Sequence, residues 1–193
     1  SDLEGFEAFI KECLEAGTET FALEIECNAL IPKVLQLLPE NNGLYLLFIP
    51  VLDDSVLKFL DNSKSNIQYF YDPISTTLSQ GAWQNNVKSD LRLYQQFIKR
   101  NHYPCTIDLS ILEHAGASIT QQLGYGLSLV HEHLQQCSLE TIQSILVKVT
   151  VGSHYFFEIT KLKALRWLCE SLFEELNIQP KLTFLAFPSQ RTK

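Results

Sequence analysis

Short apolar runs alternate with helical segments six times along the chain, and this alternation constrains the fold more than any other feature. Between the runs, apolar residues recur at helical spacing. The run Leu44–Ile49 is apolar at every position, which is typical of strands covered on both faces in a parallel sheet. Alternation with short connections indicates βαβ units joined by right-handed crossovers, so the sequence predicts an α/β fold. The six runs suited to strands span Phe21–Cys27, Leu44–Ile49, Ile67–Tyr71, Cys105–Ile111, Leu146–Val151 and Leu182–Phe187.

The segments between these runs predict helices of unequal length. Ser118 opens the clearest of them, with Gln121 three residues later as its partner in a capping box. The stretch Asp72–Asn86 is rich in Ser, Thr, Gly and Asn, so it is predicted to be a loop. The expected helices span about Leu3–Ala16, Leu30–Leu38, Val56–Leu60, Ser89–Arg100, Ser118–Leu134, Ser138–Leu146 and Phe156–Leu176.

Two parallel architectures fit this pattern. One is a doubly wound open sheet, and the other is part of a (β/α)₈ barrel of the TIM type. The barrel would be incomplete, with about six of its eight strand–helix units, because a full barrel needs about 250 residues. Periodicity does not choose between them. A chain of 193 residues is expected to form one domain, residues 1–193.

Charge and cysteine content exclude several classes of partner and compartment. The 15 Lys and Arg residues against 22 Asp and Glu give a net charge of −7. This balance argues against nucleic acid and anionic membrane surfaces, which bind clustered positive charge. No apolar run reaches the roughly 18 residues of a membrane span. The five cysteines are odd in number and lack metal-ligand spacing, so we expect free thiols and a cytoplasmic location.

Polar residues follow several of the predicted strands, at the edge where parallel α/β folds place their sites. We find no glycine-rich phosphate loop, zinc signature or hydrolase elbow. In His131-Glu132-His133 the two imidazoles would point about 200° apart on a helix and could not share a metal, so this triplet is predicted to be a solvated face. Gly124 and Gly126 are expected to permit close helix packing. The polar residues at the strand ends are Glu26, Asn28, Asp72, Glu113, His114, Ser153, His154, Ser189, Gln190 and Arg191.

Several stretches together resemble the barrel domain of the methylmalonyl-CoA mutase family, and its small non-catalytic chain more than its catalytic chain. Val151-Gly-Ser-His-Tyr-Phe-Phe-Glu-Ile-Thr-Lys-Leu-Lys-Ala-Leu-Arg166 is similar to the family's strand-to-helix passage, two aromatics followed by Glu-(Ile/Val)-Ala-Lys-Leu-Arg-Ala. Glu113-His-Ala-Gly-Ala-Ser resembles its Glu-Ala-Gly-Ala-Thr. Tyr71-Asp-Pro-Ile-Ser-Thr-Thr-Leu78 resembles Tyr-Asp-Pro-Leu-Gly-Thr-Leu of the small chain. Pro188-Ser-Gln-Arg resembles that chain's Ser-(Gln/Arg)-Arg segment.

The resemblance implies a (β/α)₈ barrel cut after its sixth strand and an adenosylcobalamin-dependent rearrangement as the activity of the whole complex. It also implies Asp72, Arg92 and Gln190 as candidate substrate contacts, with Arg92 expected on a helix face. No cofactor or metal is expected on this chain, because the family's cobalamin signature Asp-x-His-x-x-Gly is missing. The catalytic Tyr-His pair falls on Ser110-Ile111, and the family's Arg-Thr-His-Ser-Gln falls on Ala186-Phe-Pro-Ser-Gln190.

These departures favour a non-catalytic small chain that supports a large catalytic mutase chain. The fragment is also expected to self-associate through its unpaired edge strands. One alternative is an active acyl-CoA mutase or other small-molecule enzyme that uses Asp72, Arg92, His114 and His154. Another is a stand-alone binding module unrelated to the mutases.

Overall fold

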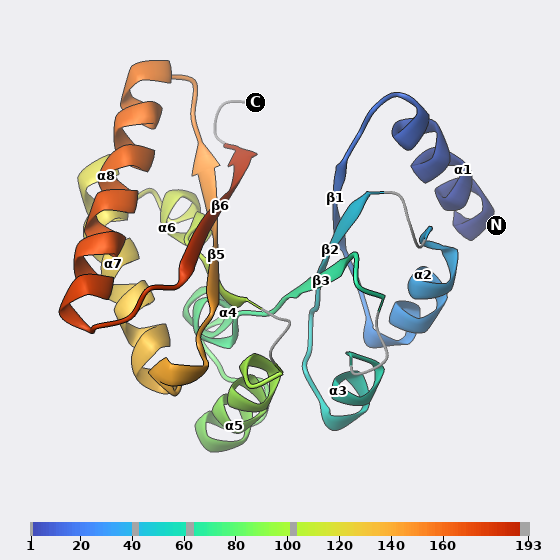
Figure 1. Cartoon of the computed structure of the whole chain (residues 1–193), viewed down its shortest axis with the longest axis horizontal. Helices are drawn as coiled ribbons and strands as arrows, with labels where there is room; N and C mark the ends of the chain where they lie inside the picture. Colours follow the sequence, from blue (N-terminus) through green and yellow to red (C-terminus); the bar gives the residue numbers. More distant parts are fainter. Residues whose placement is uncertain (1, 40–42, 61–63, 101–103, 190–193) are drawn as a thin grey trace. The chain divides into compact units, whose positions relative to one another are not determined.

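The computed structural model describes residues 2–39, 43–60, 64–100 and 104–189, and the chain divides into two compact units, residues 1–71 and 72–193 (Figure 1). Each unit contains one three-stranded parallel sheet. The interpretation of the whole chain as one domain stays a prediction.

The first unit is a parallel sheet in the order β1-β2-β3 with three helices on one side of it (Figure 1). Tyr45 in the middle strand pairs in register with Phe21 and Ile67, and its ring stacks on that of Phe21 at 5.3 Å. The apolar middle strand is buried over Tyr45–Leu47, as its sequence predicts. The elements are α1 (Asp2–Glu15), β1 (Thr20–Glu24), the 3₁₀ turn η1 (Asn28–Leu30), α2 (Ile31–Leu37), β2 (Leu44–Phe48), α3 (Asp54–Leu60) and β3 (Ile67–Phe70).

The second unit is a parallel sheet in the order β4-β5-β6, with α7 and α8 packed against each other beside it (Figure 1). Val147 in the middle strand pairs with Ile107 and Phe184, and both Val147 and Ile107 are fully buried. The elements are α4 (Pro73–Gln80), α5 (Val87–Ile98), β4 (Cys105–Asp108), α6 (Ser110–His114), α7 (Ile119–Gln136), η2 (Leu139–Thr141), β5 (Ser144–Val151), α8 (Tyr155–Glu175) and β6 (Lys181–Pro188).

The long helix α7 follows its sequence signals closely. Ser118 and Gln121 form the predicted capping box, in which each side chain bonds the other residue's backbone N–H. Gly126 confirms the prediction of close packing, because a Cβ there would lie 3.0 Å from Leu109 Cδ1. A Cβ at Gly124 would meet no atom within 4 Å, so that glycine has no such packing role.

The prediction of a TIM-type barrel is wrong. All six predicted strands form and run parallel, but they make two separate three-stranded sheets, and within the described residues β3 pairs with β2 alone and β4 with β5 alone. Leu109 N–H, just after β4, donates to Lys148 in β5, so the alternating N–H of Asp108 points the other way. The carboxylate of Asp72 accepts that N–H at 2.7 Å. A side chain thus occupies the position where a further strand would bond.

Three local predictions also differ from the structure. The predicted loop after Asp72 contains α4, because Asp72 caps it and Pro73 fits its first turn. The fourth strand ends at Asp108, where the short helix α6 follows. The helix expected at Ser138–Leu146 is one 3₁₀ turn followed by the start of β5. No helix in the described part of the chain is long and apolar enough to cross a membrane.

Candidate functional site

Asp72, the first candidate from the sequence, lies between β3 and α4 and is the first residue of the second unit. Its backbone is extended, and its Oδ1 accepts the N–H of Ser75 at 2.9 Å, which makes it the N-cap of α4. Its Oδ2 accepts the N–H of Asp108 at 2.7 Å. The one carboxylate therefore holds both the start of α4 and the end of β4.

The side chain of Asp72 also forms a buried ion pair with His133 of α7. His133 Nε2 lies 3.1 Å from Asp72 Oδ1, and the two side chains are only 0% and 3% exposed. On the other side of the imidazole, Tyr94 of α5 bonds Nδ1 through its hydroxyl at 2.7 Å. The same hydroxyl lies 3.3 Å from the sulfur of Cys105 in β4. Four side chains from four places in the unit thus form one continuous polar chain.

The electrostatics of this chain follow from burial and from the pair itself. Burial lowers the pKa of His133, but the nearby Asp72 carboxylate outweighs this effect and raises the pKa to about 10. Burial raises the pKa of Asp72, but the charge of His133 and the hydrogen bonds to Asp72 bring that pKa below its ordinary value. Both groups are therefore charged at neutral pH. Burial, together with neighbouring thiols, raises the pKa of Tyr94 well above its ordinary value, so its hydroxyl stays protonated.

These protonation states fix the direction of the hydrogen bonds. An imidazolium carries a proton on each ring nitrogen, so Nδ1–H of His133 donates to the Tyr94 oxygen. The Tyr94 hydroxyl is then left to donate to Cys105 Sγ. His133 and Asp72 are joined by an ion pair without hydrogen-bond geometry, and hydrogen bonds join His133, Tyr94 and Cys105. All four side chains are buried, so they stabilise the fold and offer no group to a substrate in solvent.

The other charged residues near the strand ends of this unit also have partners within it. Asp108 accepts from Lys148 Nζ at 3.0 Å and from both the N–H and the hydroxyl of Ser110. Asp108 and Ser110 therefore serve hydrogen bonding within the unit, and Ser110 lies in α6 and not on a strand. The hydroxyl of Ser189 donates to Glu113 at 2.7 Å.

A further buried cation, Lys161 of α8, joins two segments of the same unit. Its Nζ donates to the Thr150 carbonyl at 2.8 Å and to Gln122 Oε1 at 3.2 Å, and it pairs with Glu158. Lys161 is 5% exposed, so its ammonium group interacts with these residues and not with solvent.

The structure does not gather the remaining candidate residues around Asp72. Arg92 lies on the exposed face of α5, as expected. His114 ends α6 and His154 is the N-cap of α8, and both are exposed. Gln190 lies outside the described residues. The four residues that the active-enzyme alternative needs are therefore one buried carboxylate and three exposed side chains.

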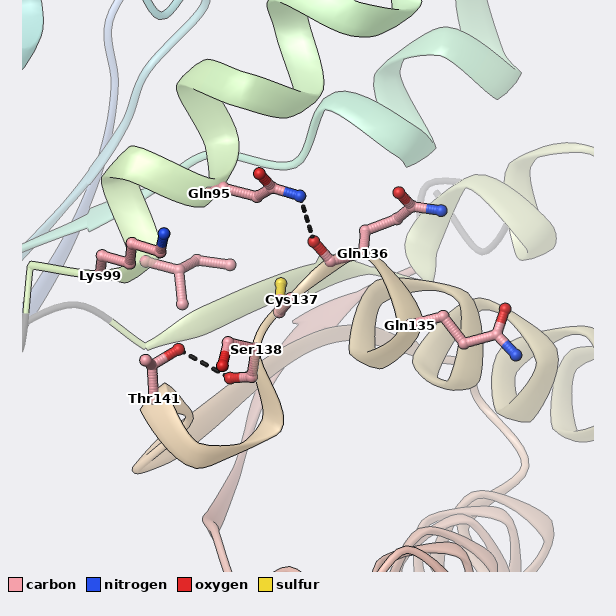
Figure 2. A pocket seen from close by; sticks show the side chains of 8 residues that line it. Gln95, Lys99, Gln135, Gln136, Cys137, Ser138 and Thr141 are labelled. Carbon is pink, nitrogen blue, oxygen red and sulfur yellow. Dashed lines mark hydrogen bonds between the residues drawn. The ribbon is translucent and has the colours of Figure 1, made fainter.

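Two of the cavities formed by described residues of the second unit bear on the candidate residues. The larger, about 740 Å³, is mostly apolar and includes His114 in its wall, together with Ile111, Tyr125 and Glu132. Asp72, Arg92 and His154 do not line it. The smaller, about 250 Å³, lies between the C-terminal part of α5 and the end of α7, where the Gln95 side chain donates to the Gln136 carbonyl at 2.8 Å (Figure 2).

Sequence reasoning missed His133. The prediction that His131-Glu132-His133 is a solvated face is wrong at its third residue, which is fully buried. The available signal was its position on α7, three residues after Val130 and next to Leu134, both of which belong to the buried stripe. Among the described residues, no group of three or more His, Cys, Asp or Glu side chains could hold a metal ion.

Comparison with models of known protein families and with curated proteins found no match to this chain.

Proposed function

We propose that this chain is a non-catalytic part of an adenosylcobalamin-dependent methylmalonyl-CoA mutase complex, in which it supports a large catalytic chain. The sequence motifs described above are the origin of the proposal. The single observation that carries its non-catalytic part is the position of Asp72, whose carboxylate is turned inward onto His133 and two backbone N–H groups.

The residues at the positions of the family's catalytic Tyr-His pair also favour a non-catalytic chain. Ser110 is 2% exposed and its hydroxyl is bonded to Asp108, whereas Ile111 lines the large cavity with an aliphatic side chain. Loss of one preorganised donor to a thioester oxygen costs about 2.7–4 kcal/mol of transition-state stabilisation. The retained Ser189 is 2% exposed and engaged by Glu113.

A cluster of exposed aromatic side chains supports the partner-binding part of the proposal. Tyr155, Phe156 and Phe157 open α8 and are 69%, 81% and 64% exposed. Three adjacent aromatics in solvent are unusual for an isolated surface, and aromatic residues are enriched in the buried centres of protein interfaces. The complex would work in the cytoplasm, where the five free thiols of this chain stay reduced.

Calorimetric titration of the purified chain tests the non-catalytic part. We expect no heat of binding at micromolar concentrations of adenosylcobalamin or of methylmalonyl-CoA. Micromolar binding of either compound would overturn this part and would favour the active enzyme that uses Asp72, Arg92, His114 and His154.

Co-expression with the catalytic chain of a methylmalonyl-CoA mutase from the same organism tests the partner. We expect the two chains to elute together in size-exclusion chromatography and Phe156→Ala to weaken the complex at least tenfold. Phe59→Ala is the matched control, because Phe59 is an exposed aromatic of the first unit, 43% exposed. Separate elution of the two wild-type chains would overturn the assignment to a mutase complex.

A further inference from the structure

The larger cavity of the second unit, about 740 Å³, is lined by residues of α4, α6 and α7. Helix α7 contributes a stripe of four side chains that begins at Tyr125 and ends at Glu132. Their spacing of three and four residues places all four on one face of the helix. The large apolar side chains that the other two helices add to the lining are Leu78, Ile111 and Leu112.

The size and lining of this cavity are those of a small-molecule site. Cavities that bind small ligands have volumes of about 300–1,000 Å³ and are mostly apolar, with a few polar groups that orient the ligand. Here two large side chains of the lining remain open to solvent, since Leu78 is 60% exposed and Tyr125 is 58% exposed. A ligand with an apolar body would remove this surface from water, which is favourable.

The polar groups of the lining mostly offer hydrogen-bond acceptors. The hydroxyl of Ser128 donates to a carbonyl of α7 at 3.0 Å, and that of Ser79 donates to a carbonyl of α4 at 2.9 Å. The oxygens of both hydroxyls remain as acceptors. Glu132 accepts from the neutral amide of Gln136 at 2.8 Å, and no cation among the described residues pairs with it. The lining therefore suits a ligand that donates hydrogen bonds and carries positive charge.

We propose that this cavity binds a small amphiphilic cation, a molecule with a protonated amine at one end and an apolar body at the other. The proposal is independent of the mutase function and concerns a ligand site within the second unit alone.

The stripe on α7 sets the orientation of the ligand. The amine donates to the Glu132 carboxylate, because hydrogen bonds between ionised groups are stronger than those between neutral groups. The apolar body extends toward Tyr125, two turns or about 10 Å along the helix, and packs on Leu129 and Leu112. His114 is the lining residue that could favour an anion instead, and its Nε2 lies 3.9 Å from a carboxylate oxygen of Glu113.

Calorimetric titration with three probes that share one alkyl chain tests the charge of the ligand. The probes are octylammonium, octanol and octanoate, used at pH 8, where alkylamines are protonated. We expect octylammonium to bind the chain one to one and at least ten times more tightly than octanol or octanoate. Equal affinity for octanol, or tighter binding of octanoate, would overturn the assignment to a cation.

Two variants test the role of the carboxylate. Glu132→Gln keeps the size of the side chain and removes its charge, so it should weaken the binding of octylammonium at least tenfold and leave that of octanol unchanged. Glu174→Gln removes the same charge from the exposed surface of α8, away from the cavity, and should bind octylammonium as the wild type does. Equal affinity of both variants would overturn the proposed contact with Glu132.

A third variant and a spectroscopic measurement test the position of the site. Ala115 lines the cavity and is exposed, so Ala115→Trp fills the space without disturbing the buried core and should abolish binding. In spectra of leucine methyl groups, octylammonium should shift the signals of Leu78, Leu112 and Leu129. Unchanged binding to Ala115→Trp, or shifts confined to other leucines, would overturn the proposal.

Discussion

Asp72 illustrates how a residue that resembles a substrate contact can have a structural role. Taking a carboxylate and an imidazolium out of water is costly, and the attraction between them offsets this cost only where further hydrogen bonds satisfy both groups. Asp72 has such bonds from the N–H groups of Ser75 and Asp108, and His133 has one to Tyr94. Removing one partner would leave an uncompensated buried charge.

We therefore expect His133→Gln to lower the free energy of unfolding by about 3–5 kcal/mol at pH 6. The folded-state pKa of His133, about 10, lies above its ordinary 6.5, so the stabilisation is full below pH 6.5 and is lost as the pH rises toward 10. The pKa of Asp72 is lowered, so its contribution is present above its ordinary 3.8 and is lost at lower pH. Urea unfolding in reducing buffer measures this between pH 6 and pH 9. The difference in free energy of unfolding between the wild type and His133→Gln should become smaller as the pH rises.

His131→Gln is the control for this prediction. His131 lies two residues earlier on the same helix and bonds only at the surface, to Gln135 at 3.4 Å. Its replacement should change stability by less than about 0.5 kcal/mol and leave the pH dependence of the wild type unchanged. A pH-independent difference between the wild type and His133→Gln would contradict the assignment of the charged pair.

At this scale the sequence singled out Asp72, but as a substrate contact and not as one half of a buried ion pair. Asp72 stands out because it follows an apolar run at the end of a predicted strand and because it matches a family motif. His133 does not stand out, because a histidine beside two other polar residues is predicted to be exposed unless its buried partner is known. That partner comes from a segment far away in the sequence, and helical periodicity carries no information about it.

At the scale of elements, α7 contains an internal comparison between two glycines. Gly124 is exposed and open to an added methyl group, whereas at Gly126 the methyl group would lie 3.0 Å from Leu109 Cδ1. Gly124→Ala should raise the free energy of unfolding by about 1 kcal/mol, which is the usual difference in helix propensity. Gly126→Ala gains the same propensity but crowds a buried leucine, and overpacking of this kind costs about 1–3 kcal/mol.

Thermal or urea unfolding of the two variants measures the difference directly. We expect Gly124→Ala to be more stable than the wild type, and Gly126→Ala to be no more stable than the wild type. Equal gains from both substitutions would show that Leu109 moves aside without cost and that the close approach at Gly126 does not limit packing.

The elements themselves were largely predictable, because local signals decide them. The strands at Leu44–Phe48 and Ile67–Phe70 and the helix at Ile119–Gln136 lie where the apolar pattern and the capping residues place them. Helix α4 was missed because its polar composition is typical of a loop. The helix begins because the Asp72 side chain caps it. The short helix α6 was missed because Ser110 and Ile111 continue the alternation of polar and apolar residues that begins at Cys105.

At the scale of the whole molecule, the parallel direction of the strands was predictable and the grouping of the strands was not. Alternation with helices forces parallel connections within each unit. Whether the fourth strand continues the sheet depends on single hydrogen-bonding groups, such as the Asp108 N–H that Asp72 accepts. No pattern in the sequence reports which acceptor that N–H will find, and for this reason the expected barrel was wrong.

The two-sheet arrangement identifies β6 as an edge strand through which the chain could self-associate. Among the described residues β6 pairs with β5 alone, and its side chains are exposed or half-buried along its whole length. An outer strand of eight residues that contains four large apolar side chains presents backbone donors and acceptors to a second copy of the chain. We expect the average mass measured by light scattering to rise above that of the monomer as the concentration increases.

A lysine on the exposed face of β6 should suppress this association, because charge at a sheet edge opposes pairing with an identical edge. Ala186→Lys places it in the strand, and Ser171→Lys places the same charge on the exposed surface of α8 as a control. The first variant should remain monomeric at concentrations where the wild type and the control associate. If all three proteins associate equally, contact is made through another surface. A monomeric wild type at high concentration would mean that the edge is protected by the fold itself.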